Sequence, residues 1–189
     1  MKSIDFYYDY GSPTAYLAWT QLSKLDKSVY IVNYIPVLLG GIFKATDNKA
    51  PGLVIPKAKW MFQDIKMYAK KYNVNFLMNA AFPVNTLYLM RGAIFAEKNN
   101  DLEKYNNAFF NAMWAENINL NEPKNIIDVL EANGFDSKKY LEAVEDNHIK
   151  DMLKKNTSEA VETGIFGVPS FIVEEKLYFG QDRMHWFLN

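Results

Sequence analysis

Cysteine is absent from this chain of 189 residues, and histidine occurs only twice, at His148 and His185. Without a thiol of its own, the chain forms no disulfide, no thiolate metal site and no Cys-x-x-Cys redox pair. Two histidines far apart in the sequence give poor support to a zinc site or to a histidine-dependent triad. We therefore expect no metal, and both histidines are expected on the surface.

A surplus of one charge and long apolar runs are missing as well. The formal net charge is −1, so no basic excess is present to neutralise phosphates, and nucleic acid is not an expected partner. No apolar run approaches the roughly 20 residues needed to span a bilayer. Charge follows too soon after the first residue for a secretory signal peptide. The sequence thus predicts a soluble, cytoplasmic protein that does not bind membranes.

Strand patterns occur near both ends of the chain, and helical patterns fill the middle. Residues 4–8 alternate apolar and polar side chains, residues 29–35 form a second strand pattern, and residues 170–179 are typical of a hairpin. From about residue 38 onward, apolar residues instead repeat at helical spacing. These patterns predict an α/β fold: a thioredoxin-like sheet domain formed by residues 1–37 and 155–189, interrupted by an all-helical insertion over residues 38–154.

Ser12 follows the first predicted strand and precedes Pro13, so it is expected to cap a helix that begins at Pro13. Free backbone N–H groups and the helix dipole favour an anion at such a position. A hydroxyl there can donate a hydrogen bond to a thiolate supplied from outside, which lowers the pKa of that thiol toward neutrality. Taken alone, a plain helix cap is the commoner role for Ser12.

A second candidate element is Val168-Pro169, which lies between a predicted helix and a predicted strand. In a thioredoxin-like order this proline is expected to be cis and to face the start of the first helix. The backbone N–H and C=O of Val168 would then be free to pair with an extended peptide such as the cysteinyl unit of glutathione. The alternative is a trans proline in an ordinary loop, which the matching Ser12-Pro13 element argues against.

A third candidate element is the start of the final predicted helix, at Gln181 and Asp182. Backbone donors there suit a carboxylate, and the side chain of Asp182 suits an ammonium group. Both groups occur at the γ-glutamyl end of glutathione. On its own, this segment is better interpreted as another helix cap beside a surface charge.

Six segments carry a resemblance to a known family: residues 5–13, 47–51, 55–64, 82–86, 164–169 and 179–183. In these segments, and in their order along essentially the whole chain, the sequence resembles the 2-hydroxychromene-2-carboxylate isomerase and kappa-class glutathione transferase family. The resemblance implies glutathione as cofactor, a homodimer, and a small electrophilic substrate from aromatic-compound breakdown. It also implies the thioredoxin-like fold with a helical insertion.

The resemblance implies roles for individual residues. It makes Ser12 the catalytic group that activates the thiolate. Two positions depart from the family pattern: Thr14 stands where an aromatic residue is common, and Asp47 stands where a glycine is common. Glutathione contacts are implied for Ser12, Pro13, Thr14, Asn48, Val168, Pro169, Gln181 and Asp182, and a substrate pocket for Lys57 and Asn85. Without the resemblance, Lys57 would be a solvated charge and Asn85 a helix cap.

Three functions remain open from the sequence. The preferred one is a glutathione-dependent isomerase of the 2-hydroxychromene-2-carboxylate type, in which reversible thiolate addition allows cis–trans isomerisation or ring opening. The first alternative is a kappa-like transferase, which leaves glutathione on the electrophile and uses the same site. The second is a non-catalytic thioredoxin-like domain that binds glutathione or a peptide, for which the departures at Thr14 and Asp47 leave room.

Overall fold

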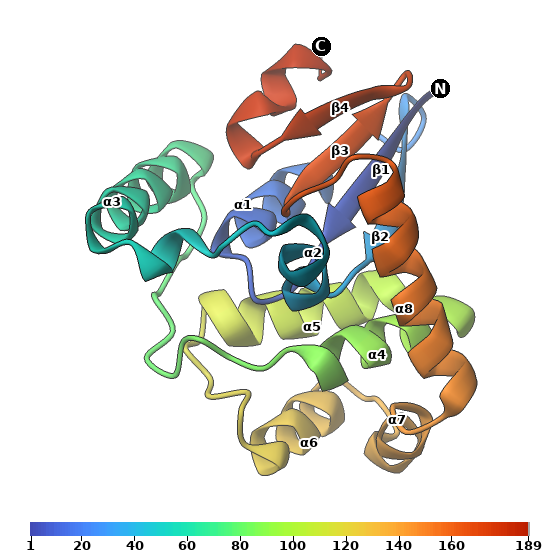
Figure 1. The fold of residues 1–189 in the computed structure, drawn as a ribbon. Helices are drawn as coiled ribbons and strands as arrows, with labels where there is room; N and C mark the ends of the chain where they lie inside the picture. Colours follow the sequence, from blue (N-terminus) through green and yellow to red (C-terminus); the bar gives the residue numbers. More distant parts are fainter. Residues whose placement is uncertain (189) are drawn as a thin grey trace.

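A four-stranded mixed sheet joins the two ends of the chain in the computed structural model, which describes residues 1–188 (Figure 1). The strand order is β2-β1-β3-β4, with β1 parallel to β2 and antiparallel to β3, and with β4 antiparallel to β3. This arrangement confirms both early strands and the late hairpin expected from the sequence. The strands are β1 (Lys2–Tyr8), β2 (Tyr30–Pro36), β3 (Ser170–Val173) and β4 (Lys176–Phe179).

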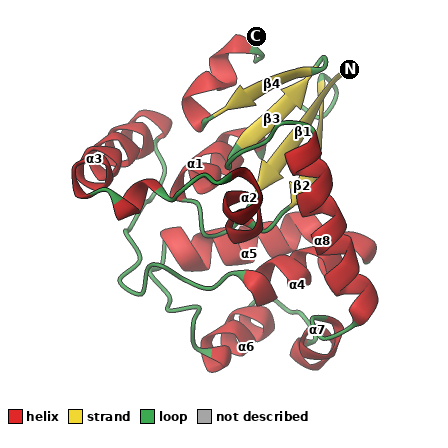
Figure 2. Cartoon of the chain, in the orientation of Figure 1, coloured by secondary structure: helices red, strands yellow, loops and turns green. Residues whose placement is uncertain are grey.

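Helices fill the chain between β2 and β3 (Figure 2), as the helical spacing predicted. None of the helices in residues 1–188 is both long and apolar enough to span a membrane. The expected final helix is a short 3-10 helix, η2 (Gln181–Trp186). The other helices are α1 (Pro13–Leu22), α2 (Leu39–Thr46), the 3-10 helix η1 (Pro51–Leu53), α3 (Ile55–Tyr72), α4 (Leu87–Lys98), α5 (Leu102–Trp114), α6 (Pro123–Ala132), α7 (Ser137–Ala143) and α8 (Asn147–Glu162).

The sheet is covered on both faces because side chains alternate along β1. Phe6 and Tyr8 are fully buried in the larger core, which includes residues of α1, α4 and α5. Tyr7 points to the opposite face, where it packs in a smaller cluster with Ile42 of α2 and Ala160 of α8. Figure 1 shows α8 running along that side, beside β2. The site at the end of β1 therefore rests on a support that is packed from both sides.

The helices between β2 and β3 share one core with the sheet. Phe110 of α5 lies 4.8 Å from the ring of Tyr10 and 5.3 Å from that of Trp19. The indole N–H of Trp114 donates to the Tyr10 carbonyl oxygen over 2.7 Å. Helix α8 is continuous through residues 154 and 155, where the sequence analysis placed a domain boundary. That boundary falls inside a helix, and the same core extends across it.

Candidate active site

Ser12 lies where β1 ends and α1 begins, and it is only 5% exposed. Its hydroxyl caps α1 by accepting a hydrogen bond from the Ala15 amide over 3.1 Å, as the sequence predicted. It donates a second hydrogen bond to the Val168 carbonyl oxygen, also over 3.1 Å. Its oxygen lies 3.0 Å from the Thr14 hydroxyl. The structure thus places the hydroxyl of Ser12 between the N-terminus of α1 and the loop before β3.

Asp9 holds the turn that presents Ser12, and the sequence analysis gave it no role. It is 1% exposed, and its carboxylate accepts hydrogen bonds from the amides of Gly11 and Leu39, each over 2.8 Å. Burial raises the pKa of Asp9, while these amide hydrogen bonds oppose the rise. Asp9 thereby ties the β1–α1 turn to the start of α2. The only sequence signal for it was its position inside the matching segment 5–13.

The Val168–Pro169 peptide bond is cis, as predicted, and both residues are buried. The amide N–H of Val168 makes no hydrogen bond within residues 1–188. Its carbonyl oxygen, however, accepts the hydrogen bond from Ser12. The expectation that both backbone groups of Val168 are free is therefore correct for the N–H and wrong for the C=O. The reason is that the Ser12 hydroxyl is close enough to use that acceptor.

A cavity of about 830 Å³ opens in front of Ser12, bounded by α2, α3, the loop before β3, and η2. It does not include Asn85, whose side-chain oxygen accepts a hydrogen bond from the Leu87 amide over 3.1 Å at the start of α4. The structure therefore leaves Asn85 apart from the other predicted site residues. Those that line the cavity are Ser12, Pro13, Thr14, Asn48, Lys57, Val168, Pro169, Gln181 and Asp182.

Carboxylates gather at the η2 side of the cavity. Asp182 pairs with Arg183, with 2.9 Å between its carboxylate oxygen and the guanidinium nitrogen. Burial and the nearby charge of Asp182 raise the pKa of Asp64, which lines the same cavity from α3. Gln181 is 4% exposed, and its side-chain amide makes no hydrogen bond within the described residues. This side of the cavity therefore offers two acids for a cation and one open amide for a polar group.

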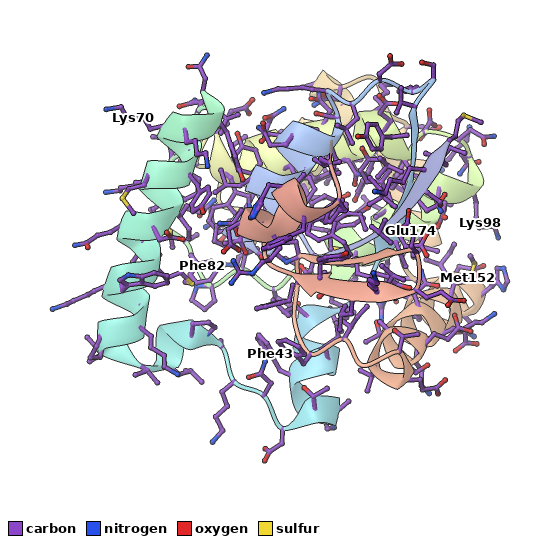
Figure 3. The ribbon with its side chains drawn as sticks, turned by 90° about the horizontal axis from the view of Figure 1, so that it is seen from above. Phe43, Lys70, Phe82, Lys98, Met152 and Glu174 are labelled. Atoms are coloured by element: carbon purple, nitrogen blue, oxygen red, sulfur yellow. The ribbon has the colours of Figure 1, made fainter. Side chains whose placement is uncertain are left out.

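Much of the cavity lining is aromatic or apolar, and the sequence analysis did not single out these residues. Phe43 of α2 and Phe82, which precedes α4, both lie toward α3 in Figure 3, far from Lys98 and Glu174. The rings of Phe166 and Phe179 lie 4.7 Å apart. Several of the apolar residues lie in segments that carry the family resemblance. No local sequence pattern, however, shows that helices, strands and loops far apart in the chain bring these residues together. The aromatic and apolar wall consists of Phe43, Trp60, Met61, Phe62, Phe82, Phe166 and Phe179.

Asn48 connects two sides of this cavity. Its side-chain N–H donates to the Phe166 carbonyl oxygen over 2.8 Å, which joins the end of α2 to the loop that carries Val168. The residue before it, Asp47, ends α2 with φ of +53°, in the left-handed region. Glycine adopts that conformation most easily, which agrees with the glycine that the resemblance implies at this position. Asp47 is therefore a non-glycine residue at a position whose backbone conformation favours glycine.

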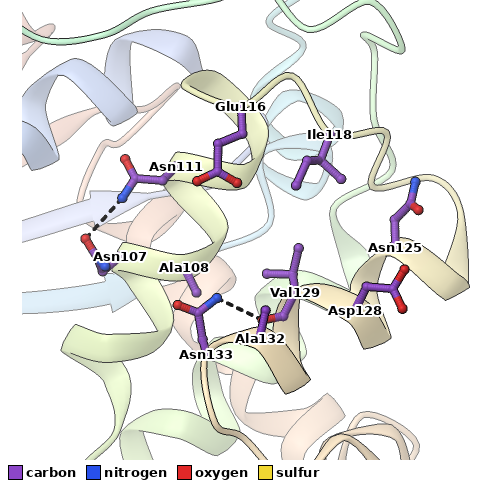
Figure 4. A pocket seen from close by; sticks show the side chains of 10 residues that line it. All are labelled: Asn107, Ala108, Asn111, Glu116, Ile118, Asn125, Asp128, Val129, Ala132 and Asn133. Carbon is purple, nitrogen blue, oxygen red and sulfur yellow. Dashed lines mark hydrogen bonds between the residues drawn. The ribbon is translucent and has the colours of Figure 1, made fainter.

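Two other hollows in the described part of the chain contain none of the predicted site residues. One of about 380 Å³ lies between α5 and α6 and is lined by several asparagine side chains, including Asn107 and Asn133 (Figure 4). Another of about 410 Å³ lies beside α8. Both histidines are exposed, as expected. Within residues 1–188, no group of three or more acidic or histidine side chains is arranged to hold a metal ion. The 830 Å³ cavity is thus the place where all of the predicted site residues except Asn85 meet.

Comparison with known proteins settles the family. The family model described as a DSBA-like thioredoxin domain matches residues 3–189. The chain belongs to the DSBA-like thioredoxin family. A solved structure of 2-hydroxychromene-2-carboxylate isomerase matches this DSBA-like domain with a TM-score of 0.89 at 25% identity, over 97% of this chain and 91% of that one. A probable DsbA oxidoreductase from Streptomyces coelicolor shares the fold, with a TM-score of 0.75 at 16% identity over 96% and 84% of the two chains.

Curated relatives of this DSBA-like domain carry the two names that the resemblance suggested. It is 27% identical over 186 residues to 2-hydroxychromene-2-carboxylate isomerase of Sphingobium xenophagum, covering 97% of this chain and 94% of the relative. It is 26% identical over 199 residues to glutathione S-transferase kappa 1 of Homo sapiens, covering 97% and 88%. The predicted resemblance and the thioredoxin-like fold with its helical insertion are confirmed. These relatives are isomerases and glutathione transferases by name.

Proposed function

We propose that this protein is a glutathione-dependent isomerase of the 2-hydroxychromene-2-carboxylate type. One observation carries the proposal: the Ser12 hydroxyl and the Val168 backbone lie 3.1 Å apart on one wall of the cavity. A hydroxyl beside an open backbone edge is what a cysteinyl residue needs, because the edge can bind its main chain while the hydroxyl meets its sulfur. The chain has no thiol of its own to place there.

The rest of glutathione matches the polar side of the same cavity. Its γ-glutamyl end carries an ammonium group and a carboxylate. Asp182 and Asp64 supply negative charge for the ammonium group, and the open amide of Gln181 can donate to the carboxylate. Asn48 and Lys57 also line this cavity, and in this proposal they contact the glycyl end. In this proposal the predicted binding residues contact one extended tripeptide.

Ser12 and the start of α1 would hold the sulfur as a thiolate. The hydroxyl donates a hydrogen bond to the ionised form, and the positive end of the helix dipole favours the same charge. Each effect stabilises the thiolate over the thiol, so both lower the pKa of the thiol. The thiolate is the nucleophilic form, so the bound cofactor is reactive near neutral pH.

When bound, glutathione would supply a thiolate able to form a carbon–sulfur bond reversibly at a carbon–carbon double bond conjugated to a carbonyl, which would allow that bond to rotate or a ring to open before the thiolate is released again. The apolar wall around Phe43 and Phe82 suits the flat organic part of such a substrate.

A kappa-like transferase is the second candidate, because the kappa-class relatives align over nearly the whole chain. It would use the same thiolate but keep the carbon–sulfur bond. Mass spectrometry of the product distinguishes the two reactions. An unchanged substrate mass supports isomerisation, and a mass increased by one glutathione supports transfer. Binding of glutathione with no turnover of enones or halogenated aromatics would instead support a non-catalytic binding domain.

The role of Ser12 is tested by Ser12→Ala. Loss of the donor should lower kcat by about 100-fold or more, the range seen when one hydrogen bond to a developing anion is removed. Ser158, which is exposed on α8, offers a matched control, and Ser158→Ala should leave kcat unchanged. Circular dichroism checks that both variants fold. Unchanged turnover in folded Ser12→Ala would remove Ser12 from the mechanism.

The assembly and location implied by the resemblance remain proposals. We propose a cytoplasmic homodimer that acts in the breakdown of aromatic compounds, since the resemblance to the isomerase family implies all three. Light scattering of the purified protein tests the dimer directly. A monomer at micromolar concentration would contradict that part of the proposal and leave the site chemistry untouched.

A further inference from the structure

The hydrogen bonds around Ser12 determine whether Ser12 or Thr14 is the donor in the contact between their hydroxyl groups. A hydroxyl has one proton to donate and two lone pairs that accept. The Val168 carbonyl oxygen can only accept a hydrogen bond, so the Ser12 hydroxyl is the donor in their contact of 3.1 Å. The Ala15 amide, also at 3.1 Å, fills one lone pair of the Ser12 oxygen. In the remaining contact, 3.0 Å from the Thr14 hydroxyl, Thr14 must therefore be the donor.

We propose that Thr14 is a positioning residue for the Ser12 hydroxyl, an inference that rests on the proposed glutathione-dependent function. By donating to the Ser12 oxygen, Thr14 and Ala15 together occupy both of its lone pairs. The Ser12 proton is then left with one direction, outward toward the Val168 carbonyl and the cavity. When the cysteinyl N–H of glutathione takes over that carbonyl, the Ser12 proton, still directed toward the cavity, can donate to the sulfur there. No proton leaves Ser12 in this step.

The Thr14 contact also makes Ser12 a stronger donor. A hydroxyl that accepts hydrogen bonds is polarised and donates more strongly, because bonds in a chain reinforce one another. The thiolate should therefore be better stabilised when Thr14 carries a hydroxyl. Thr14 departs from the pattern that the resemblance implies, so this contact is a property of this chain's own sequence.

Thr14 is well suited to a selective test. It is half-buried at the cavity wall, and its side chain makes no other hydrogen bond within residues 1–188. Thr14→Val keeps the branched shape and removes the hydroxyl, while Thr14→Ser keeps the hydroxyl. The charged groups facing the sulfur position are the same in every variant: Asp47, Lys49, Lys57, Asp64, Asp182 and Arg183 line the cavity, and Asp9 lies beneath the turn.

The experiment measures the thiol pKa of bound glutathione from the ultraviolet absorbance of the thiolate across a pH series. Thr14→Val should raise that pKa by a few tenths to about one unit, as expected for loss of one neutral hydrogen bond. The acid limb of the kcat/KM profile should move to higher pH by the same amount. Below the pKa of the bound thiol, where glutathione stays protonated in both proteins, its affinity measured by calorimetry should match that of the wild type, and above that pKa it should be lower by the same factor as the pKa shift. Thr14→Ser should restore the wild-type pKa and profile.

Three outcomes would overturn the inference. A thiol pKa in Thr14→Val equal to that of the wild type shows that Thr14 does not act through Ser12, and leaves the proposed function standing. A shift in Thr14→Ser as large as in Thr14→Val assigns the effect to side-chain shape. Absence of any bound thiolate in the wild type overturns both this inference and the proposed function. If Thr14→Val does not fold, Thr14→Ala removes the same hydroxyl and is judged by the same results.

Discussion

At the scale of single residues, the local sequence predicted Ser12 as a helix cap and a donor to an external sulfur. The cap is present, with the Ala15 amide as its partner. The bond to the Val168 carbonyl could not be predicted, because it joins residues 156 positions apart in the chain. Neighbouring residues in the sequence show that a hydroxyl can cap a helix. They do not show which distant acceptor receives the hydrogen bond that this hydroxyl donates.

Asp9 is a residue whose importance only the structure reveals. Asp9→Asn replaces one carboxylate oxygen with an N–H donor, which would face the amide of either Gly11 or Leu39. A buried amide left without an acceptor costs about 1–3 kcal/mol, so the free energy of unfolding should fall by that amount. Urea denaturation measures it. Asp151→Asn, on the exposed surface of α8, is the control and should change stability by less than about 0.5 kcal/mol.

The effect of Asp9→Asn on the free energy of unfolding should also depend on pH. Burial raises the pKa of Asp9 in the folded protein above its unfolded value, so the folded state binds this proton more tightly. The stability contributed by this group is therefore greatest below the unfolded pKa and declines as the pH rises through the folded pKa. The stability advantage of the wild type over Asp9→Asn should shrink across that acid range. An advantage that grows with pH would contradict the raised pKa.

At the scale of elements, the sequence predicted that a hairpin and then a helix end the chain. It did not predict the backbone conformation of the turn or the type of the helix. The turn of the predicted hairpin falls at Glu174 and Glu175, and both residues adopt positive φ although neither is glycine. The predicted final helix is a short 3-10 helix. Local sequence identified polar turn residues and a helix start, while packing of Met184 and Phe187 in the core determines how this segment ends.

Gly180 determines the backbone conformation at the start of η2, and substitution of Gly180 tests this role. Its φ is +97°, and a Cβ atom there would lie 2.6 Å from a carboxylate oxygen of Asp182. Gly180→Ala should therefore displace Asp182 and weaken glutathione binding about tenfold or more, in line with roughly 1.4 kcal/mol per tenfold change. Calorimetry measures this affinity. Gly40→Ala is the matched control, because a Cβ at Gly40 meets nothing within 4 Å in helix α2.

At the scale of the whole molecule, the order of strands and helices was predictable because hydrophobic periodicity changes clearly along the chain. The apolar wall of the cavity was not, since Phe43, Trp60, Phe82 and Phe166 come from elements far apart in sequence. The absence of a flexible linker indicated that the helical insertion packs on the sheet domain, but it did not show which side chains join the two in one core. A sequence shows where an amphipathic helix lies and which face is apolar, but not which other element covers that face.

The shared core predicts cooperative unfolding. Trp114 in α5 bonds to Tyr10 after β1 and packs against Phe76 and Phe82, so the helical block and the sheet stabilise each other. Far-ultraviolet circular dichroism and tryptophan fluorescence should therefore report one coincident transition in urea. Two separate transitions would show that the helical block folds independently of the sheet.

The most direct test of the central claim is a crystal structure of the protein grown with millimolar glutathione. The account predicts the cysteinyl sulfur within hydrogen-bond distance of the Ser12 oxygen, with the cysteinyl N–H on the Val168 carbonyl and the γ-glutamyl end beside Gln181 and Asp182. A cavity without the tripeptide, or a sulfur directed away from the start of α1, would contradict it.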